Sequence, residues 1–162
     1  MGNLTYDGQI DLSDLKYVEL TEKEIPKCTT RWGDILFNRT NSKELVGKTA
    51  VVTQREPLAI AGYLVRGRVN AKGNPFYIST YLNSVHGKAV LRNMCKNIVG
   101  MANINAQEFQ DIAIALPPKP EQDRFQEKVI EIEKSKIPFL SALDATEKLF
   151  TSLQYRAFRG EL

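Results

Sequence analysis

The side chains that most often catalyse reactions or bind metals are few in this sequence and lie far apart along it. The chain of 162 residues contains one histidine, His86, and two cysteines, Cys28 and Cys95. Three such groups fall short of a four-ligand structural zinc site, and no base is indicated that would activate either cysteine as a nucleophile. Two cysteines also cannot build a disulfide framework. We therefore expect no catalytic residue, no metal site and no cofactor.

One segment comes close to a phosphate-binding loop. Residues 42–49 have the sequence SKELVGKT, which ends in the Gly-Lys-Thr of that motif. The first glycine of the motif is replaced by Ser42, and the residues after Thr49 predict a strand. A phosphate-binding loop needs both the tight turn and a following helix whose N-terminus faces the phosphate. The segment therefore does not predict a nucleotide site.

Basic side chains are concentrated in the middle of the chain. Residues 31–100 carry eleven Lys and Arg against three acidic residues, a net charge of +8, whereas residues 1–30 carry −3 and residues 101–162 carry −2. A concentrated positive field attracts polyanions, and nucleic acid is the commonest of these. The alternative is a solvated basic surface without a partner. The charge distribution by itself favours neither.

The elements that would position these side chains form an α/β (α+β) domain with a central sheet over residues 1–116. Turn residues separate short apolar or alternating segments, which is typical of strands. The strands are expected at 16–20, 35–37, 49–52, 63–66, 76–78 and 109–114, and a helix at 79–96. A helical turn is expected after Thr21, because Thr21 and Glu24 have the spacing of a capping box.

A proline-rich connector, 117–120, separates this domain from a predicted long helix, 121–158, and a short tail, 159–162. Apolar residues recur at alternating spacings of four and three, which is the pattern of a helix that pairs with another helix. The pairing positions are Phe125, Val129, Ile132, Phe139, Leu143, Phe150, Leu153 and Ala157, with the polar Lys136 and Thr146 in the same row. Pro138 removes one backbone hydrogen bond and predicts a kink. A helical hairpin that turns near Pro138 is the alternative.

Three stretches of the sequence resemble a known family. The first is GDILFNRTNS at 33–42 with VGK at 46–48. The second is ANIN at 102–105, which leads to LPP at 116–118 and EQ at 121–122. The third is SLQYRAFRGEL at 152–162. In this order and spacing they resemble one half of the specificity subunit of type I restriction–modification systems.

The resemblance implies a target recognition domain that binds one half of a split DNA sequence, followed by a conserved long helix. Family members carry two such units, whose helices pair and dock the modification subunits. This chain has one unit, and its recognition domain is expected to be truncated at its N-terminus relative to the family. The resemblance implies double-stranded DNA, a methyltransferase subunit and the restriction subunit as partners. Through its C-terminal helix the chain is expected to pair with a second copy of itself or with a second specificity half.

Contacts to DNA phosphates and base edges require Lys, Arg, Asn and Gln side chains on accessible surfaces. Three segments carry such residues: the motif after the first strand, the loop around residue 70 and one face of the helix 79–96. The candidates are Arg39, Asn41, Lys43, Arg66, Arg68, Asn70, Lys72, Lys88, Arg92 and Lys96. Of these, we favour the loop between Arg66 and Lys72 for the contacts that vary with the DNA sequence.

The sequence therefore predicts a non-catalytic subunit that recognises DNA and acts as a scaffold, with the associated subunits providing methylation and cleavage. The alternative is a protein-interaction fragment that docks on these subunits without reading DNA itself. No apolar run approaches the length of a membrane span, and no secretory signal is visible. We expect a cytoplasmic protein that contacts no membrane.

Overall fold

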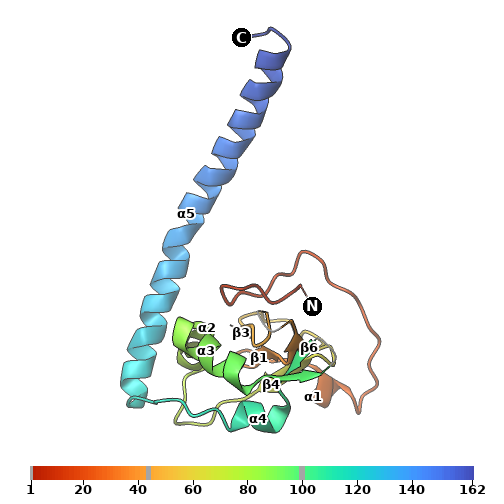
Figure 1. The fold of residues 1–162 in the computed structure, drawn as a ribbon, viewed down its shortest axis with the longest axis vertical. Helices are drawn as coiled ribbons and strands as arrows, with labels where there is room; N and C mark the ends of the chain where they lie inside the picture. The colour runs from red at the N-terminus through yellow and green to blue at the C-terminus, as the bar shows by residue number, and fades with distance from the viewer. Residues whose placement is uncertain (1, 43–44, 99–100) are drawn as a thin grey trace. The chain divides into compact units, whose positions relative to one another are not determined.

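The fold is described from a computed structural model, which covers residues 2–42, 45–98 and 101–162. The chain divides into two compact units, residues 1–123 and residues 124–162. The first unit holds two small sheets and several short helices, and the second is helical (Figure 1). The predicted combination of an α+β domain and a long C-terminal helix is confirmed.

The first sheet has the order β3-β1-β4 and is antiparallel throughout. Its strands are β1 (Ile35–Asn38), β3 (Thr49–Val51) and β4 (Leu64–Gly67), close to the predicted positions. All four residues of β1 are buried, as expected for a central strand that is covered on both faces. Phe37 points to one apolar cluster, with Leu82, Leu91 and Ile104, and Leu36 to the other. Alternating side chains of β1 thus pack into two separate apolar clusters.

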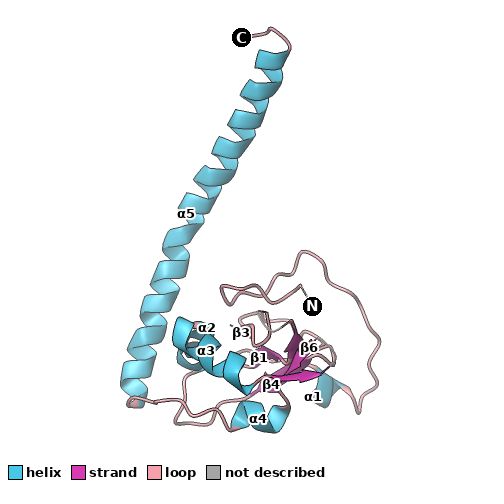
Figure 2. Ribbon diagram, in the orientation of Figure 1, coloured by secondary structure: helices cyan, strands magenta, loops and turns pink. Residues whose placement is uncertain are grey.

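The second sheet has the order β2-β6-β5 and is also antiparallel. It comprises β2 (Thr40–Asn41), β5 (Lys96–Ile98) and β6 (Met101–Asn103), and Figure 2 shows the strands of both sheets in magenta. The backbone carbonyl of Arg39 accepts a hydrogen bond from the Ile104 nitrogen at 2.9 Å, which continues this pairing.

Two predicted strands are wrong. Residues 76–78 belong to helix α2 (Pro75–Asn83), because the Asn74 side chain caps the Phe76 and Tyr77 nitrogens and Pro75 occupies the first turn. Residues 109–110 belong to helix α4 (Ala106–Gln110), which begins with a capping box. Beyond α4 the predicted alternation persists, since Ile112 and Ile114 pack on the core although this segment forms no strand.

Two further predictions also need correction. Residues 16–20 form no strand, and Tyr17 is 98% exposed. The predicted helix 79–96 is instead two helices, α2 and α3 (Val85–Met94), which meet at Ser84. The Ser84 hydroxyl accepts a hydrogen bond from the Gly87 nitrogen and starts the second helix. A Cβ on Gly87 would lie 2.1 Å from the Tyr81 carbonyl oxygen, so only glycine permits this junction. The turn expected after Thr21 is present: Thr21 and Glu24 are hydrogen-bonded ahead of α1 (Ile25–Cys28).

Helix α5 (Lys119–Phe158) is one continuous helix of 40 residues. It begins two residues before the predicted start and passes through Pro138 without interruption, so the hairpin alternative is wrong. Its first turn belongs to the first compact unit, where the Gln122 side chain is completely buried. No helix in the described part of the chain is both long and apolar enough to cross a membrane.

Candidate nucleic-acid interface

A tight turn formed by residues 31–34 places a buried carboxylate just before β1. The Asp34 nitrogen donates to the Arg31 carbonyl at 3.1 Å, and the Gly33 nitrogen donates to the Val52 carbonyl at 2.8 Å. Gly33 has a φ of +82°, a conformation that glycine adopts without strain. The Asp34 carboxylate accepts from the Arg31 nitrogen at 3.0 Å, and Asp34 is 1% exposed. The turn is therefore a rigid support.

Three arginines converge on this carboxylate. Arg68 binds it with both branches of its guanidinium, at 2.7 Å from Nε to Oδ1 and 3.2 Å from Nη2 to Oδ2. Arg66 Nε lies 3.9 Å from Oδ2, and Arg31 Nε lies 3.8 Å from Oδ1. The hydrogen bonds that Arg68 donates to the Asp34 carboxylate raise the pKa of Arg68 above its ordinary value. These four side chains, the arginine cluster, comprise one carboxylate and three guanidiniums, so together they carry a net charge of +2.

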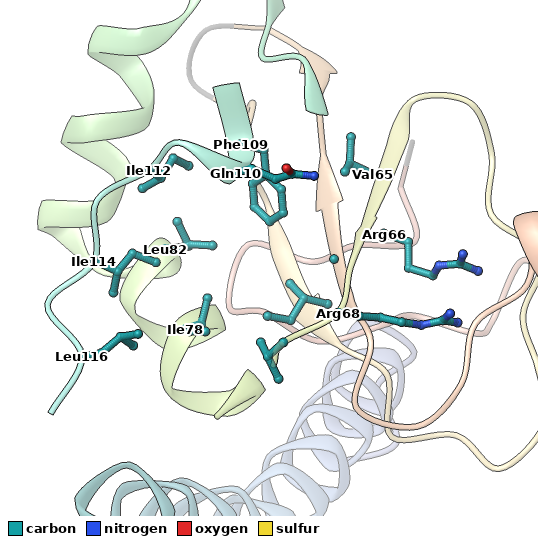
Figure 3. A pocket seen from close by; sticks show the side chains of 13 residues that line it. Val65, Arg66, Arg68, Ile78, Leu82, Phe109, Gln110, Ile112, Ile114 and Leu116 are labelled. Atoms are coloured by element: carbon teal, nitrogen blue, oxygen red, sulfur yellow. The ribbon is translucent and has the colours of Figure 1, made fainter. Parts of the chain in front are cut away.

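Strand β4 explains why Arg66 and Arg68 lie together. Residues two apart on an extended chain point to the same side. Both guanidiniums project away from the apolar side chains of Ile78, Leu82 and Ile112, as Figure 3 shows. Those side chains, together with residues of β4 and both arginines, line a cavity of about 380 Å³. Arg66 is also tied back to the backbone, because its Nη1 donates to the Thr29 carbonyl oxygen.

The loop that follows β4 is held at both ends. Arg68 is bound to Asp34 at one end, and Gln122 secures the other: its Nε2 donates to the Lys72 carbonyl at 3.0 Å and its Oε1 accepts from the Asn74 nitrogen at 2.8 Å. Within the loop, the Asn70 side chain accepts from the Lys72 nitrogen at 3.0 Å. The Lys72 side chain is exposed. The loop favoured from the sequence thus carries accessible polar groups on a fixed backbone.

Arg39 lies between β1 and β2 instead, and Asn41 lies in β2. Arg39 Nε donates to the Asn103 side chain at 3.4 Å, and Asn41 Oδ1 accepts from the Ser42 nitrogen at 2.9 Å. Both are half-buried and engaged in local structure. Lys43, which was predicted beside them, lies outside the described residues.

Lys88, Arg92 and Lys96 do not form the predicted row on one helix face. Helix α3 ends at Met94, so Lys96 is part of β5. Lys88 is buried, and its Nζ donates to the Gly47 carbonyl at 2.7 Å and to Asn83 Oδ1 at 2.9 Å. Burial, together with the nearby positive charges, lowers the pKa of Lys88 to about 8. Only Arg92 remains an exposed cation on α3 among these three. Lys88 therefore has a structural role, because its ammonium is turned into the domain.

Sequence reasoning overlooked two members of the arginine cluster, Arg31 and its organiser Asp34, and also Trp32 between them. Trp32 is 59% exposed, and its ring lies 6.2 Å from that of Phe76 at an interplanar angle of 52°. The Arg-x-Gly-Asp sequence is typical of a tight turn and could have indicated that Arg31 and Asp34 lie close together. Nothing in the sequence pairs residue 34 with residue 68.

The residues considered for chemistry remain apart. In the described ranges, no three His, Cys, Asp or Glu side chains are grouped so that they could hold a metal ion. Cys28 and Cys95 are not joined in a disulfide, and the Cys95 thiol donates to the Leu91 carbonyl at 3.0 Å. The His86 ring stands edge-on to Tyr81, with centroids 5.8 Å apart.

The predicted pairing face of α5 is largely exposed within this single chain. Phe125, Ile132, Phe139, Leu143, Phe150 and Leu153 are all exposed, and Phe139 reaches 75%. Surface ion pairs such as Lys148 with Asp144, at 2.7 Å, lie elsewhere on the helix. An exposed apolar row of this length is typical of an interaction surface.

Comparisons with known proteins give consistent results. No family model matches the chain. It is 29% identical over 165 residues to the type I restriction enzyme EcoKI specificity subunit of Escherichia coli (strain K12), covering 96% of this chain and 35% of the relative. It is 32% identical over 120 residues to the putative type I restriction enzyme MjaX specificity subunit of Methanocaldococcus jannaschii, covering 72% of this chain and 28% of the relative.

A solved structure has the same fold. Its title describes the complex assembly and conformational transition of the type I R-M system, and it aligns with a TM-score of 0.62 at 24% identity, over 83% of this chain and 33% of that chain. This chain thus spans about a third of the length of the curated relatives it matches. The similarities confirm the resemblance inferred from the sequence motifs.

Proposed function

This chain is related to type I restriction enzyme specificity subunits, and from that premise we propose that it is a non-catalytic DNA-recognition and scaffold subunit, or half-subunit, of a type I restriction–modification complex. Its domain would bind double-stranded DNA and its long helix would pair with another specificity chain. Methylation and cleavage would be performed by the modification and restriction subunits with which it assembles. Its place would be the cytoplasm, where these partners meet DNA.

The observation that carries this proposal is the arginine cluster around Asp34. A surface that keeps a net charge of +2 on a preorganised support suits DNA phosphates, because the side chains are ordered before binding. The adjacent loop adds Asn70 and Lys72, the kinds of side chain that contact base edges and phosphates. We propose Arg31, Arg68, Asn70 and Lys72 as the principal contacts, with Arg66 supporting them. Arg39, Asn41, Lys43, Arg92 and Lys96 would contribute secondary contacts, and Lys88 none.

The helix supplies the scaffold part of the proposal. A partner helix would cover the apolar row of α5, and a second copy of this chain offers a matching row. Two recognition domains held by paired helices would bind two half-sites at a fixed spacing, as dimeric DNA-binding proteins do.

The test is a titration of duplex DNA at increasing salt. The chain, assembled with its methyltransferase subunit, is mixed with a fluorescent random-sequence duplex, and affinity is followed by anisotropy. Phosphate contacts predict a steep loss of affinity with salt, with a slope that changes by about 0.9 for each contact. Arg31→Gln and Lys72→Gln should flatten this slope while the bidentate Arg68–Asp34 pair is retained.

Matched controls are Lys128→Gln and Lys148→Gln, two exposed lysines on α5 that lie outside the recognition domain. They should leave the slope unchanged. If the assembled complex binds no duplex at any salt concentration but still contains this chain, the DNA-recognition role is refuted. The chain would then be the docking fragment of the alternative hypothesis.

A further inference from the structure

Trp32 is the single tryptophan of the chain, and it is 59% exposed at the tip of the 31–34 turn. Large aromatic side chains are usually buried for most of their area. Here the backbone is held on both sides: before Trp32 the Arg31 nitrogen donates to the buried Asp34 carboxylate, and after it the Gly33 nitrogen donates to the Val52 carbonyl. The indole is therefore held at the surface by a rigid turn.

Phe76 limits the freedom of the indole on one side. The two rings are 6.2 Å apart and tilted by 52°, within the range of favourable aromatic pairs. Phe76 is itself fixed, because it lies in the first turn of α2 and its nitrogen donates to Asn74 Oδ1 at 2.9 Å. The aromatic surface is thus preorganised, so little conformational entropy would be lost when a ligand covers it.

The charges around Trp32 indicate what such a ligand is. The Arg31 side chain next to it is 70% exposed and that of Arg68 is 37% exposed, whereas the Asp34 side chain between them is 1% exposed. A ligand that approaches this surface therefore meets positive charge beside an aromatic plane. Duplex DNA presents negative phosphates beside apolar sugars and the base edges in its grooves, which is the complementary arrangement.

We propose that Trp32 is a DNA-contact residue whose indole packs against the sugars and base edges of a duplex, while Arg31 and Arg68 bind the flanking phosphates. This inference rests on the proposed function and adds to it a specific apolar contact. Through this contact the affinity for DNA would depend on an aromatic ring at residue 32. Added salt would not abolish this dependence.

The experiment uses the tryptophan as its own reporter. The chain is produced with 5-fluorotryptophan and assembled with unlabelled subunits, so that its fluorine resonance reports Trp32 alone. DNA binding is measured in the same samples by anisotropy of a labelled duplex. We expect the resonance to shift at saturating DNA and to lose its solvent-isotope effect, as the indole leaves water. Trp32→Ala should weaken binding about tenfold, and Trp32→Phe should weaken it less.

The control is Tyr17→Ala. Tyr17 is an exposed aromatic of the same unit in the acidic segment 1–30, and its loss should leave affinity unchanged. If DNA binds while the Trp32 resonance stays unchanged, the inference fails and the proposed function stands. If the resonance shifts when the methyltransferase subunit is added and not with DNA, Trp32 is a protein contact and the inference also fails. If no duplex binds, the inference about Trp32 and the proposed function are both refuted.

Discussion

Phe37 and Phe139 have the same side chain and opposite surroundings. Phe37, in the first unit, is 0% exposed and packs in a cluster with residues from both sheets and from α2, α3 and α4, whereas Phe139, on α5, is 75% exposed. The first unit therefore buries an apolar core within the chain, and the helix leaves its apolar row largely uncovered. This difference leads us to expect that contacts within the chain stabilise the first unit and that a partner stabilises the second.

The polar groups show the same contrast. In the domain, the buried Asp34 and Gln122 side chains are each satisfied by several partners at fixed distances. On α5, the ion pairs of Lys128 with Glu131 and Lys148 with Asp144 are exposed and contribute little to stability. Buried polar groups thus organise structure in the first unit, whereas the charges on the second lie at its surface.

The largest expected effect is on association. Replacing Leu143 and Phe150 by Asp places charges in the apolar row, and each lost apolar contact is worth about 1.5–3 kcal/mol, counted on both chains of a dimer. We expect the sedimenting mass to fall from that of a pair to that of a single chain. Tyr155→Asp, on the opposite side of the heptad, is the control and should leave the mass unchanged. An unchanged mass for the double variant would contradict helix pairing through this row.

The next prediction tests the two phenylalanines directly. Phe37→Ala should lower the free energy of unfolding of the domain by about 3–5 kcal/mol, because it leaves a cavity in the core. Phe139→Ala should leave that quantity unchanged within about 0.5 kcal/mol. Urea unfolding at low protein concentration, where helix pairing is absent, measures both. Equal losses for the two variants would show that the helix is stabilised by contacts within its own chain.

A smaller effect is expected for the buried amide. Gln122→Ala leaves the Lys72 and Pro117 carbonyls and the Asn74 nitrogen without their partner, which should cost about 1–3 kcal/mol. Gln154→Ala, the same change on an exposed part of α5, should cost less than about 0.5 kcal/mol. Urea unfolding of the two variants provides the comparison. Similar costs would refute the anchoring role of Gln122.

The smallest effect concerns pH. The pKa of Lys88 is about 8 in the folded domain and about 10.4 in an unfolded chain. Between these values the unfolded chain holds a proton that the folded chain has released, so stability rises with pH. Relative to Lys88→Met, we expect the free energy of unfolding of the native chain to rise by on the order of 1 kcal/mol between pH 7.5 and 9.5. Parallel pH profiles for the two proteins would rule out this linkage.

The elements best predicted from the sequence are those that local patterns determine. The spacing of four and three predicted α5 nearly to the residue, and the strands around residues 35 and 49 followed from their apolar runs between turns. Residues 76–78 were misassigned because Phe, Tyr and Ile favour strands, whereas the capping by Asn74 and Pro75 decided the outcome. Capping residues immediately before an ambiguous apolar run therefore deserve more weight than the run itself.

The candidate site was predicted only in part, for a different reason. The basic loop was recognised from its composition, but the role of Asp34 depends on the pairing of Ile35 with Gly67 in the sheet. That register brings Asp34 and Arg68 into contact, although 34 positions separate them in the sequence. No local pattern encodes this pairing. Lys88 was misjudged because a lysine four residues before an arginine suggests a shared exposed face, whereas its ammonium satisfies carbonyl and amide oxygens inside the domain.

The loop held between Arg68 and Asn74 has a consequence for changing what the protein recognises. Its two ends are clamped by side chains from other elements, Asp34 and Gln122, and inside it the Asn70 side chain accepts from the Lys72 nitrogen. Under the proposed function, exchanging residues 69–71 for those of a relative, with a hydrogen-bond acceptor kept at residue 70, would alter the presented side chains while the clamps hold both ends. This loop would then be the starting point for retargeting.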